Sequence, residues 1–140
     1  MKVLTVKEPW ASLIVQGFKE YEFRSWKTNY RGKVLIHAGL SKEDCLKFKD
    51  YHLDISSGEI IGEAYITDCI LVDEVFDKKL RKLDSTVYSN DHIGLYAFKL
   101  EKNKKYSKKI KCKRSPLDEN PMPGHLFELH PVNEVNTKGQ

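Results

Sequence analysis

Alternation of apolar and polar positions is the main structural signal along this chain. A period of two, typical of strands with one buried face, recurs in several short segments. The expected strands are residues 2–7, 21–24, 34–38, 60–72, 95–100 and 106–112. Gly62 lies inside the longest of them and predicts a bulge or a sharp bend, as the corners of barrels need.

A short helix is predicted directly after the first strand, over residues 9–16. Pro9 suits the first helical position, where its fixed φ helps and its missing N–H costs nothing. Trp10, Leu13 and Ile14 recur with the spacing of one helical face. Gly17 suits the left-handed conformation that commonly ends a helix.

Two further segments carry helix signals. Gly39 is expected to break the strand before it, and Ser41 is expected to cap a helix that reaches about residue 51. The charged segment 77–83 predicts a helix or a loop. These elements favour an α+β fold, a small mixed β-barrel of about five to six strands with two or three flanking short helices, over a parallel sheet.

Length and composition fit one domain. The chain has 140 residues, 40% of them hydrophobic, enough for one core. We expect a single domain over residues 1–130, with a proline-rich loop at 115–123, a short strand within 124–129 and a flexible tail at 131–140.

Composition also argues against several classes of protein. No stretch approaches the ~20 apolar residues of a membrane-spanning helix, and the start lacks a signal-peptide pattern. Three widely spaced cysteines favour neither a disulfide framework nor a zinc site. We therefore expect a cytoplasmic protein with no membrane partner, no metal and no cofactor.

Positive charge is concentrated in one run. Residues 99–114 hold nine basic and one acidic side chain, whereas the whole chain has a net charge of +4. One interpretation is a surface for phosphates, with Lys104, Lys105, Lys108 and Lys109 as candidate nucleic-acid contacts. The other is an edge strand whose lysines discourage aggregation.

The segment after Gly17 combines a cation, a carboxylate and a guanidinium within six residues. Lys19 can meet a phosphate or a base carbonyl, Glu22 can accept from an exocyclic amine, and Arg24 offers a planar donor fork. Strict alternation places Glu22 and Arg24 on one face of a strand and Phe23 on the other. The alternative is a set of surface charges that pair with one another.

This segment, Gly17-Phe-Lys19-Glu-Tyr-Glu22, resembles the Gly-x-Lys-x-x-Glu signature of the ASCH domain family in the PUA-like superfamily. The similarity extends over about residues 2–112, through the strand and Pro-Trp helix before it, and through 30–38, 58–69 and 96–100 after it. The resemblance implies a closed or nearly closed barrel with a cleft in which the signature strand lies exposed. It also implies binding of RNA or another nucleic acid.

One branch of the family hydrolyses the acetyl amide of N4-acetylcytidine with a lysine and a threonine on the signature segment. Lys19 matches that lysine, whereas Glu22 stands at the threonine position and has no hydroxyl to act as a nucleophile. The resemblance therefore supports binding more than amide hydrolysis by that route.

Four other side chains are candidates for the same cleft, each with a structural alternative. Trp10 and Trp26 are able to stack on a base, although Trp10 also fits the apolar helix face. Ser12 lies beside Trp10 and is either a cleft residue or a helix filler. His37 lies in an apolar strand, where a hydrogen-bonded core histidine is the common alternative.

Two functions from different classes remain open at this stage. The first is a binding module for RNA, another nucleic acid or a nucleoside-like small molecule. The second is a small hydrolase, acting on N4-acylated cytidines or as a ribonuclease, with Lys19 and Glu22 as base and partner. Replacing Lys19 or Glu22 is expected to weaken binding with little loss of stability, because the strand is expected to be exposed. The sequence does not choose between RNA and DNA, nor does it fix the oligomeric state.

Overall fold

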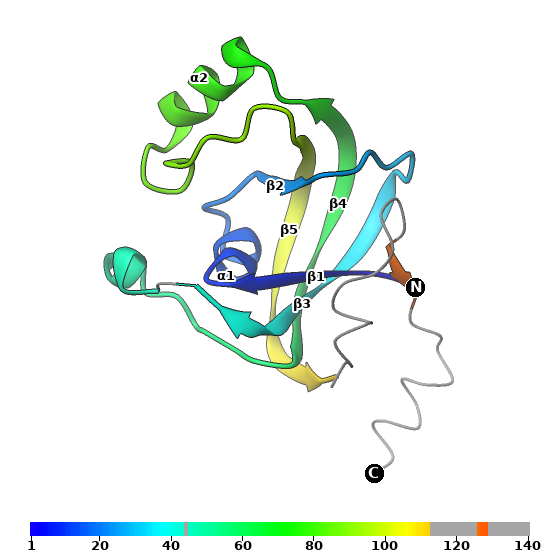
Figure 1. The fold of residues 1–140 in the computed structure, drawn as a ribbon. Coiled ribbons are helices and arrows are strands. Elements are labelled where there is room, and N and C mark those ends of the chain that lie inside the picture. The colour runs from blue at the N-terminus through cyan, green and yellow to red at the C-terminus, as the bar shows by residue number, and fades with distance from the viewer. Residues whose placement is uncertain (44, 113–125, 129–140) are drawn as a thin grey trace.

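Six strands form one strongly curved mixed sheet in the computed structural model, which describes residues 1–43, 45–112 and 126–128. Their order across the sheet is β2-β5-β4-β3-β1-β6 (Figure 1). β1 and β3 are parallel, and the other neighbours are antiparallel. The strands are β1 (Lys2–Glu8), β2 (Tyr21–Arg24), β3 (Gly32–Lys42), β4 (Glu59–Leu71), β5 (Tyr96–Lys111) and β6 (Phe127–Glu128).

The sheet is barrel-like but does not close, because β2 and β6 are its two edges. β6 pairs only with Lys2 and Val3 of β1. Beyond Val3, no described strand pairs with that side of β1. A side chain crosses this seam instead: Nη2 of Arg24 on β2 donates a hydrogen bond of 2.7 Å to the Thr5 carbonyl oxygen on β1.

The helix α1 (Trp10–Val15) packs against β1, β3, β4 and β5 (Figure 1). Its Ile14 and Val15 belong to the main core cluster with apolar side chains from these strands. The predicted end of the helix is confirmed, since Gly17 has a φ of +88°. The turn brings the backbone N–H groups of Phe18 and Lys19 onto the Leu13 carbonyl, and it fixes where the signature segment begins.

Two more helices flank the sheet. The 3₁₀ helix η1 (Leu46–Tyr51) buries Phe48, whose ring meets Trp10 edge-on with centroids 5.5 Å apart. The helix α2 (Glu74–Leu83) is capped at its N-terminus by Asp73, whose carboxylate accepts a hydrogen bond from the Phe76 N–H. The expected α+β class, with a few short helices on a mixed sheet, is confirmed.

Three predictions of local structure were wrong. The expected strands 95–100 and 106–112 are one strand, β5, which runs without interruption through exposed residues 101–105. β3 continues through Gly39 to Lys42, where Lys42 pairs with Glu8 of β1. The helix expected from Ser41 is therefore reduced to η1.

The predicted irregularity at Gly62 is confirmed, since the pairing of β4 with β5 shifts register there. A Cβ atom on Gly62 would lie 2.3 Å from the Lys104 carbonyl oxygen and 2.7 Å from Cγ1 of Val15. Only glycine therefore lets β5 and α1 approach this point of the sheet.

Part of the C-terminal region can be compared with expectation. β6 lies within the short strand expected at 124–129, whereas the loop 115–123 and the tail 131–140 lie outside the described residues. Within the described part of the chain, no helix has the length and apolar character needed to cross a membrane.

Candidate functional site

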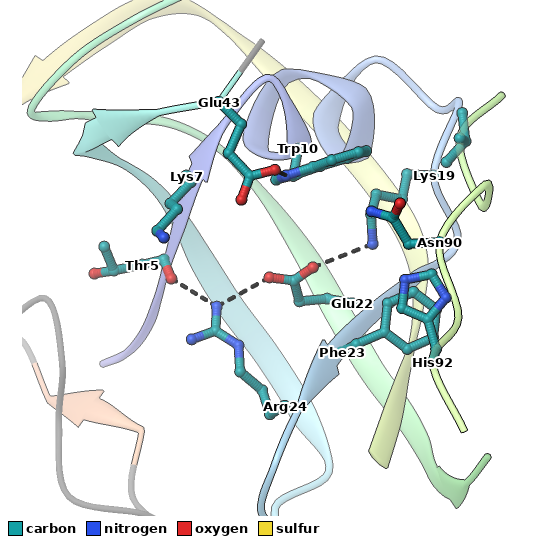
Figure 2. A pocket seen from close by; sticks show the side chains of 11 residues that line it. Thr5, Lys7, Trp10, Lys19, Glu22, Phe23, Arg24, Glu43, Asn90 and His92 are labelled. Atoms are coloured by element: carbon teal, nitrogen blue, oxygen red, sulfur yellow. Dashed lines mark hydrogen bonds and ion pairs between the residues drawn. The ribbon is translucent and has the colours of Figure 1, made fainter. Parts of the chain in front are cut away.

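A pocket of about 320 Å³ lies at the seam where the sheet does not close. Residues from β1, α1, β2, the end of β3 and the loop before β5 meet around it (Figure 2). The lining residues are Thr5, Lys7, Trp10, Lys19, Glu22, Phe23, Arg24, Glu43, Val87, Asn90 and His92.

Lys19 and Glu22 of the signature form one chain of ion pairs in this pocket with Arg24, which lies two residues after it. Nζ of Lys19 lies 3.1 Å from Oε1 of Glu22, and Nη2 of Arg24 lies 3.0 Å from Oε2 of the same carboxylate (Figure 2). Lys19 also donates to the Tyr21 carbonyl oxygen. The structure thus brings together all three residues that the sequence singled out.

The expectation of an exposed signature strand was wrong. Lys19 is 5% exposed and Glu22 is 9% exposed. The Lys19 amine lies 5.9 Å from the ring centroid of Trp10 on α1 and 5.7 Å from that of Tyr88 in the loop before β5. Both groups have therefore lost most of their water, and each depends on the other for compensation.

Burial and charge act on Lys19 and Glu22 in different ways. Burial lowers the pKa of the Lys19 amine, and the Glu22 charge offsets this only in part. Burial alone would raise the pKa of Glu22, but the charges of Lys19 and Arg24 outweigh it and hold that pKa below its usual value. Glu22 is thus a fixed anion between two donors, and Lys19 is the group that burial pushes toward neutrality.

Aromatic rings form two walls of the pocket. The Trp10 indole N–H donates to Oε2 of Glu43 at 3.1 Å, which fixes the ring at one wall. Phe23 stacks on His92 with centroids 3.8 Å apart and an interplanar angle of 17°. Nζ of Lys19 lies 4.6 Å from the Phe23 centroid and 5.9 Å from that of Trp10, so the cation lies between the walls.

The loop between α2 and β5 is tied down by specific contacts. The Tyr88 hydroxyl accepts from the backbone N–H groups of Glu20 and Tyr21, and burial raises its pKa to about 12. The buried carboxylate of Asp77 on α2 accepts from the backbone N–H of His92 at 3.3 Å. These bonds hold His92 against Phe23.

Two buried polar atoms of this pocket have no hydrogen-bond partner among the described residues: Nε of Arg24 and Nδ1 of His92. Burial, followed by the nearby charge of Lys19, lowers the pKa of His92. A buried donor without a partner costs roughly 1–3 kcal/mol, so the pocket holds unsatisfied hydrogen-bonding capacity.

The structure places Ser12, Trp26 and His37 outside this pocket. Ser12 is buried and donates to the Glu8 carboxylate at 2.6 Å. Trp26 packs edge-on against Phe98, with centroids 5.3 Å apart. His37 is fully buried; Nε2 donates to the Cys112 carbonyl at 2.7 Å, which leaves Nδ1 to accept from the Thr5 hydroxyl at 3.1 Å. For Ser12 and His37 these contacts agree with the structural alternative, and Trp26 is a packing residue.

The four candidate lysines lie on the second half of β5, also outside the pocket. Lys105 and Lys109 lie 3.2 and 3.0 Å from the Asp54 carboxylate. Asp54 is itself held in place, since its N–H donates to the Gln16 side chain and its carbonyl accepts from Ser12. Two of the four candidate lysines are thus partly neutralised.

Several lining residues carry no signal in the sequence. Lys7, Glu43, Asn90 and His92 lie in segments without a motif, and the topology alone brings them to the seam. Strict alternation assigned Phe23 to the face opposite Glu22, yet both line the pocket. A pocket at an open sheet edge is reached from both faces of the strand, which alternation does not anticipate.

A comparison with known protein families identifies the family of this chain. The family model of the ASCH domain matches residues 4–110. The chain belongs to the ASCH domain family. The match includes the signature, nearly all of β1 and β5, and the whole of β2, β3 and β4.

Proteins similar in sequence to this chain include Activating signal cointegrator 1 from Homo sapiens, which is 36% identical over 81 residues. Activating signal cointegrator 1 from Mus musculus is 33% identical over 81 residues. These matches cover 48% of this chain and 14% of each relative, so the chain spans a small part of their length.

Similar solved structures include two point mutants of ZmASCH from Zymomonas mobilis. A serine-to-alanine mutant has a TM-score of 0.53 at 18% identity, and the match covers 98% of this chain and 92% of the other. A tyrosine-to-phenylalanine mutant of the same protein has a TM-score of 0.53 at 18% identity and covers 98% and 94%. At these identities the likeness shows the shared fold.

Proposed function

We propose that this ASCH domain binds nucleic acid by taking one unpaired base into the seam pocket, with RNA as the expected partner. The observation that carries this proposal is the meeting of two aromatic walls with the charged chain of Lys19, Glu22 and Arg24 in one pocket. The general association of the ASCH family with RNA binding agrees with it.

The size of the pocket supports a single base rather than a duplex. About 320 Å³ is at the lower end of the ~300–1,000 Å³ of small-molecule sites. Sequence-dependent RNA recognition mostly uses unstacked bases placed against aromatic side chains. Trp10 and the Phe23–His92 pair offer such surfaces on either side of the charged groups.

The charges support hydrogen bonding to a base edge. Glu22 stays ionised because two cations hold its pKa down, and its carboxylate keeps acceptor capacity beyond the bonds from Lys19, Arg24 and the Phe23 backbone N–H. A carboxylate in this state accepts a hydrogen bond from an exocyclic amine such as cytosine N4.

The cytoplasmic location of the protein remains a prediction from composition.

Fluorescence anisotropy with labelled RNA hexamers, single-stranded and duplex, tests the proposal. Phe23→Leu removes a stacking wall, and Phe18→Leu changes an exposed phenylalanine outside the pocket. We expect preference for single strands, and about tenfold weaker binding in Phe23→Leu only, the scale of one stacked base. Equal binding of duplex, with no effect of Phe23→Leu, would overturn the proposal.

A hydrolase remains the second candidate because burial lowers the pKa of Lys19 beside a carboxylate. An amine of this kind is able to accept a proton from water when it is neutral. The Thr5 hydroxyl is bound to His37 and points away from Glu22 in Figure 2, so water is the expected nucleophile. Chromatography after incubation with N4-acetylcytidine or RNA tests this; turnover that persists in Lys19→Met would contradict it.

A further inference from the structure

The seam pocket has two chemically different ends. In Figure 2, Lys7, Thr5 and the guanidinium of Arg24 lie toward one end, whereas Phe23 and His92 lie toward the other. Glu22 lies between them. A ligand that fills the pocket therefore meets aromatic rings on one side and cationic donors on the other.

Lys7 is the cation of this pocket that is available to a ligand. It is exposed, and among the described residues its amine has no ion pair and no hydrogen bond. Lys19, by contrast, is buried and donates to Glu22 and Tyr21. An exposed ammonium of this kind loses little hydration energy when it meets an anion.

Arg24 adds donors at the same end. Only Nη2 has acceptors among the described residues, in Glu22 and Thr5. Nε is buried without a partner, and Nη1 has no acceptor in the described part of the chain. The guanidinium thus retains unused donors on Nε and Nη1, each of which is able to donate a single hydrogen bond to a phosphate or carboxylate oxygen.

One group opposes an anion here. The Glu43 carboxylate also lines the pocket, where the Trp10 indole N–H holds it at 3.1 Å. Its charge repels a phosphate, so its removal should act in the opposite direction to the removal of Lys7. Substitutions of Lys7 and Glu43 should therefore have opposite effects on phosphate binding at the same site.

We propose that Lys7 and Arg24 form a phosphate subsite at the mouth of the pocket, so that the ligand is a nucleotide unit, bound by base and phosphate together. This inference rests on the proposed function, because the base of that unit occupies the aromatic end. A free nucleoside would leave the cationic end unused. An internal nucleotide of a strand, or a mononucleotide, would use both ends.

Calorimetry on the full chain compares the four ribonucleosides with their 5′- and 3′-monophosphates at low salt. The readout is the ratio of the two dissociation constants for each base. We expect a monophosphate to bind about tenfold more tightly than its nucleoside, the scale of a charged hydrogen bond to phosphate. The ratio should fall severalfold in Lys7→Gln and rise in Glu43→Gln. Lys82→Gln on α2, an exposed lysine outside the pocket, should not change it.

The outcomes separate this inference from the function on which it rests. Equal affinity for nucleosides and monophosphates in the native chain overturns the phosphate subsite and leaves base binding intact. Binding of inorganic phosphate as tightly as any monophosphate also overturns it, since base and phosphate are then not bound together. Failure of every nucleoside, nucleotide and RNA hexamer to bind removes the proposed function itself.

Discussion

The two cationic regions of this domain differ in how their charges are used. In the pocket, Lys19 and Arg24 share the carboxylate of Glu22, and burial shifts the pKa of the lysine. On the second half of β5 most of the lysines are exposed and Lys109 is half-buried. Asp54 pairs with Lys105 and Lys109. The first region keeps a fixed geometry at a cost in desolvation, whereas the second provides a screened positive surface. We expect the pocket to determine which ligand binds, and the lysines of β5 to strengthen the electrostatic attraction of nucleic acid to the domain.

The largest effect should follow from Glu22→Gln. This change leaves Lys19 buried without its counter-charge, and loss of one partner of a buried pair typically costs about 3–5 kcal/mol. Urea unfolding measures the loss, with Glu20→Gln on the exposed side of the segment as the control. A loss below about 1 kcal/mol, in the range of a surface pair, would place the pocket charges in the same class as those of β5.

This prediction revises the expectation that Lys19 and Glu22 contribute little to stability. That expectation followed from an exposed strand, and the burial of both side chains removes its premise. Binding by such variants should accordingly be compared per folded molecule.

Tyr88→Phe should have the next largest effect. It removes the hydroxyl that accepts two backbone N–H groups at the start of the signature strand, and a buried unsatisfied donor costs roughly 1–3 kcal/mol. Thermal unfolding checks the loss of stability. Tyr65→Phe is the matched control, because no described residue lies within hydrogen-bond distance of the Tyr65 hydroxyl. Equal melting temperatures for the two variants would show that the loop is held by other contacts.

The lysines of β5 should divide into two unequal pairs. Lys104→Gln with Lys108→Gln should weaken RNA binding about threefold more than Lys105→Gln with Lys109→Gln, because the Asp54 carboxylate already offsets part of the charge of the second pair. Asp54→Asn should remove this difference and steepen the salt dependence. Anisotropy titrations at several salt concentrations give both quantities. Unchanged affinity in all variants would favour the other interpretation, in which the lysines of residues 99–114 protect an edge strand from aggregation.

The smallest effect concerns pH. The pKa of His92 lies below its ordinary value of 6.5, so the unfolded chain takes up a proton first as the pH falls. Stability should therefore decrease on acidification below pH 6.5. The lowered pKa of Glu22 should add a second decrease below pH 4.5. His92→Gln should remove the first decrease only, as urea midpoints across pH would show; an unchanged profile would contradict the assignment.

Local pattern predicted much of this fold. Alternation located β1, β2 and β4, and Gly17 located the end of α1. Alternation missed the middle of β5, where residues 101–105 are all polar or charged and exposed and therefore show no apolar period. Alternation also missed the extension of β3, which depends on pairing with β1 rather than on its own residues.

The site was predictable only where a motif lies within one segment. Lys19, Glu22 and Arg24 share such a segment, whereas Lys7, Glu43 and His92 reach the pocket from three other parts of the chain. Ser12 and His37 lie in suitable sequence neighbourhoods but bond to Glu8, Thr5 and Cys112. Nothing local separates a hydroxyl or imidazole that faces a pocket from one that completes a core.

The most direct test of base binding in the seam pocket uses the two tryptophans of the chain. The Trp10 indole N–H lies at the pocket wall, and Trp26 packs against Phe98 outside the pocket. In a ¹⁵N NMR titration with a single-stranded RNA hexamer, we expect the Trp10 indole signal to shift with the fraction bound. The Trp26 indole signal should stay in place. A titration in which backbone signals of β5 shift and the Trp10 indole does not would show that RNA binds the basic strand and leaves the pocket empty.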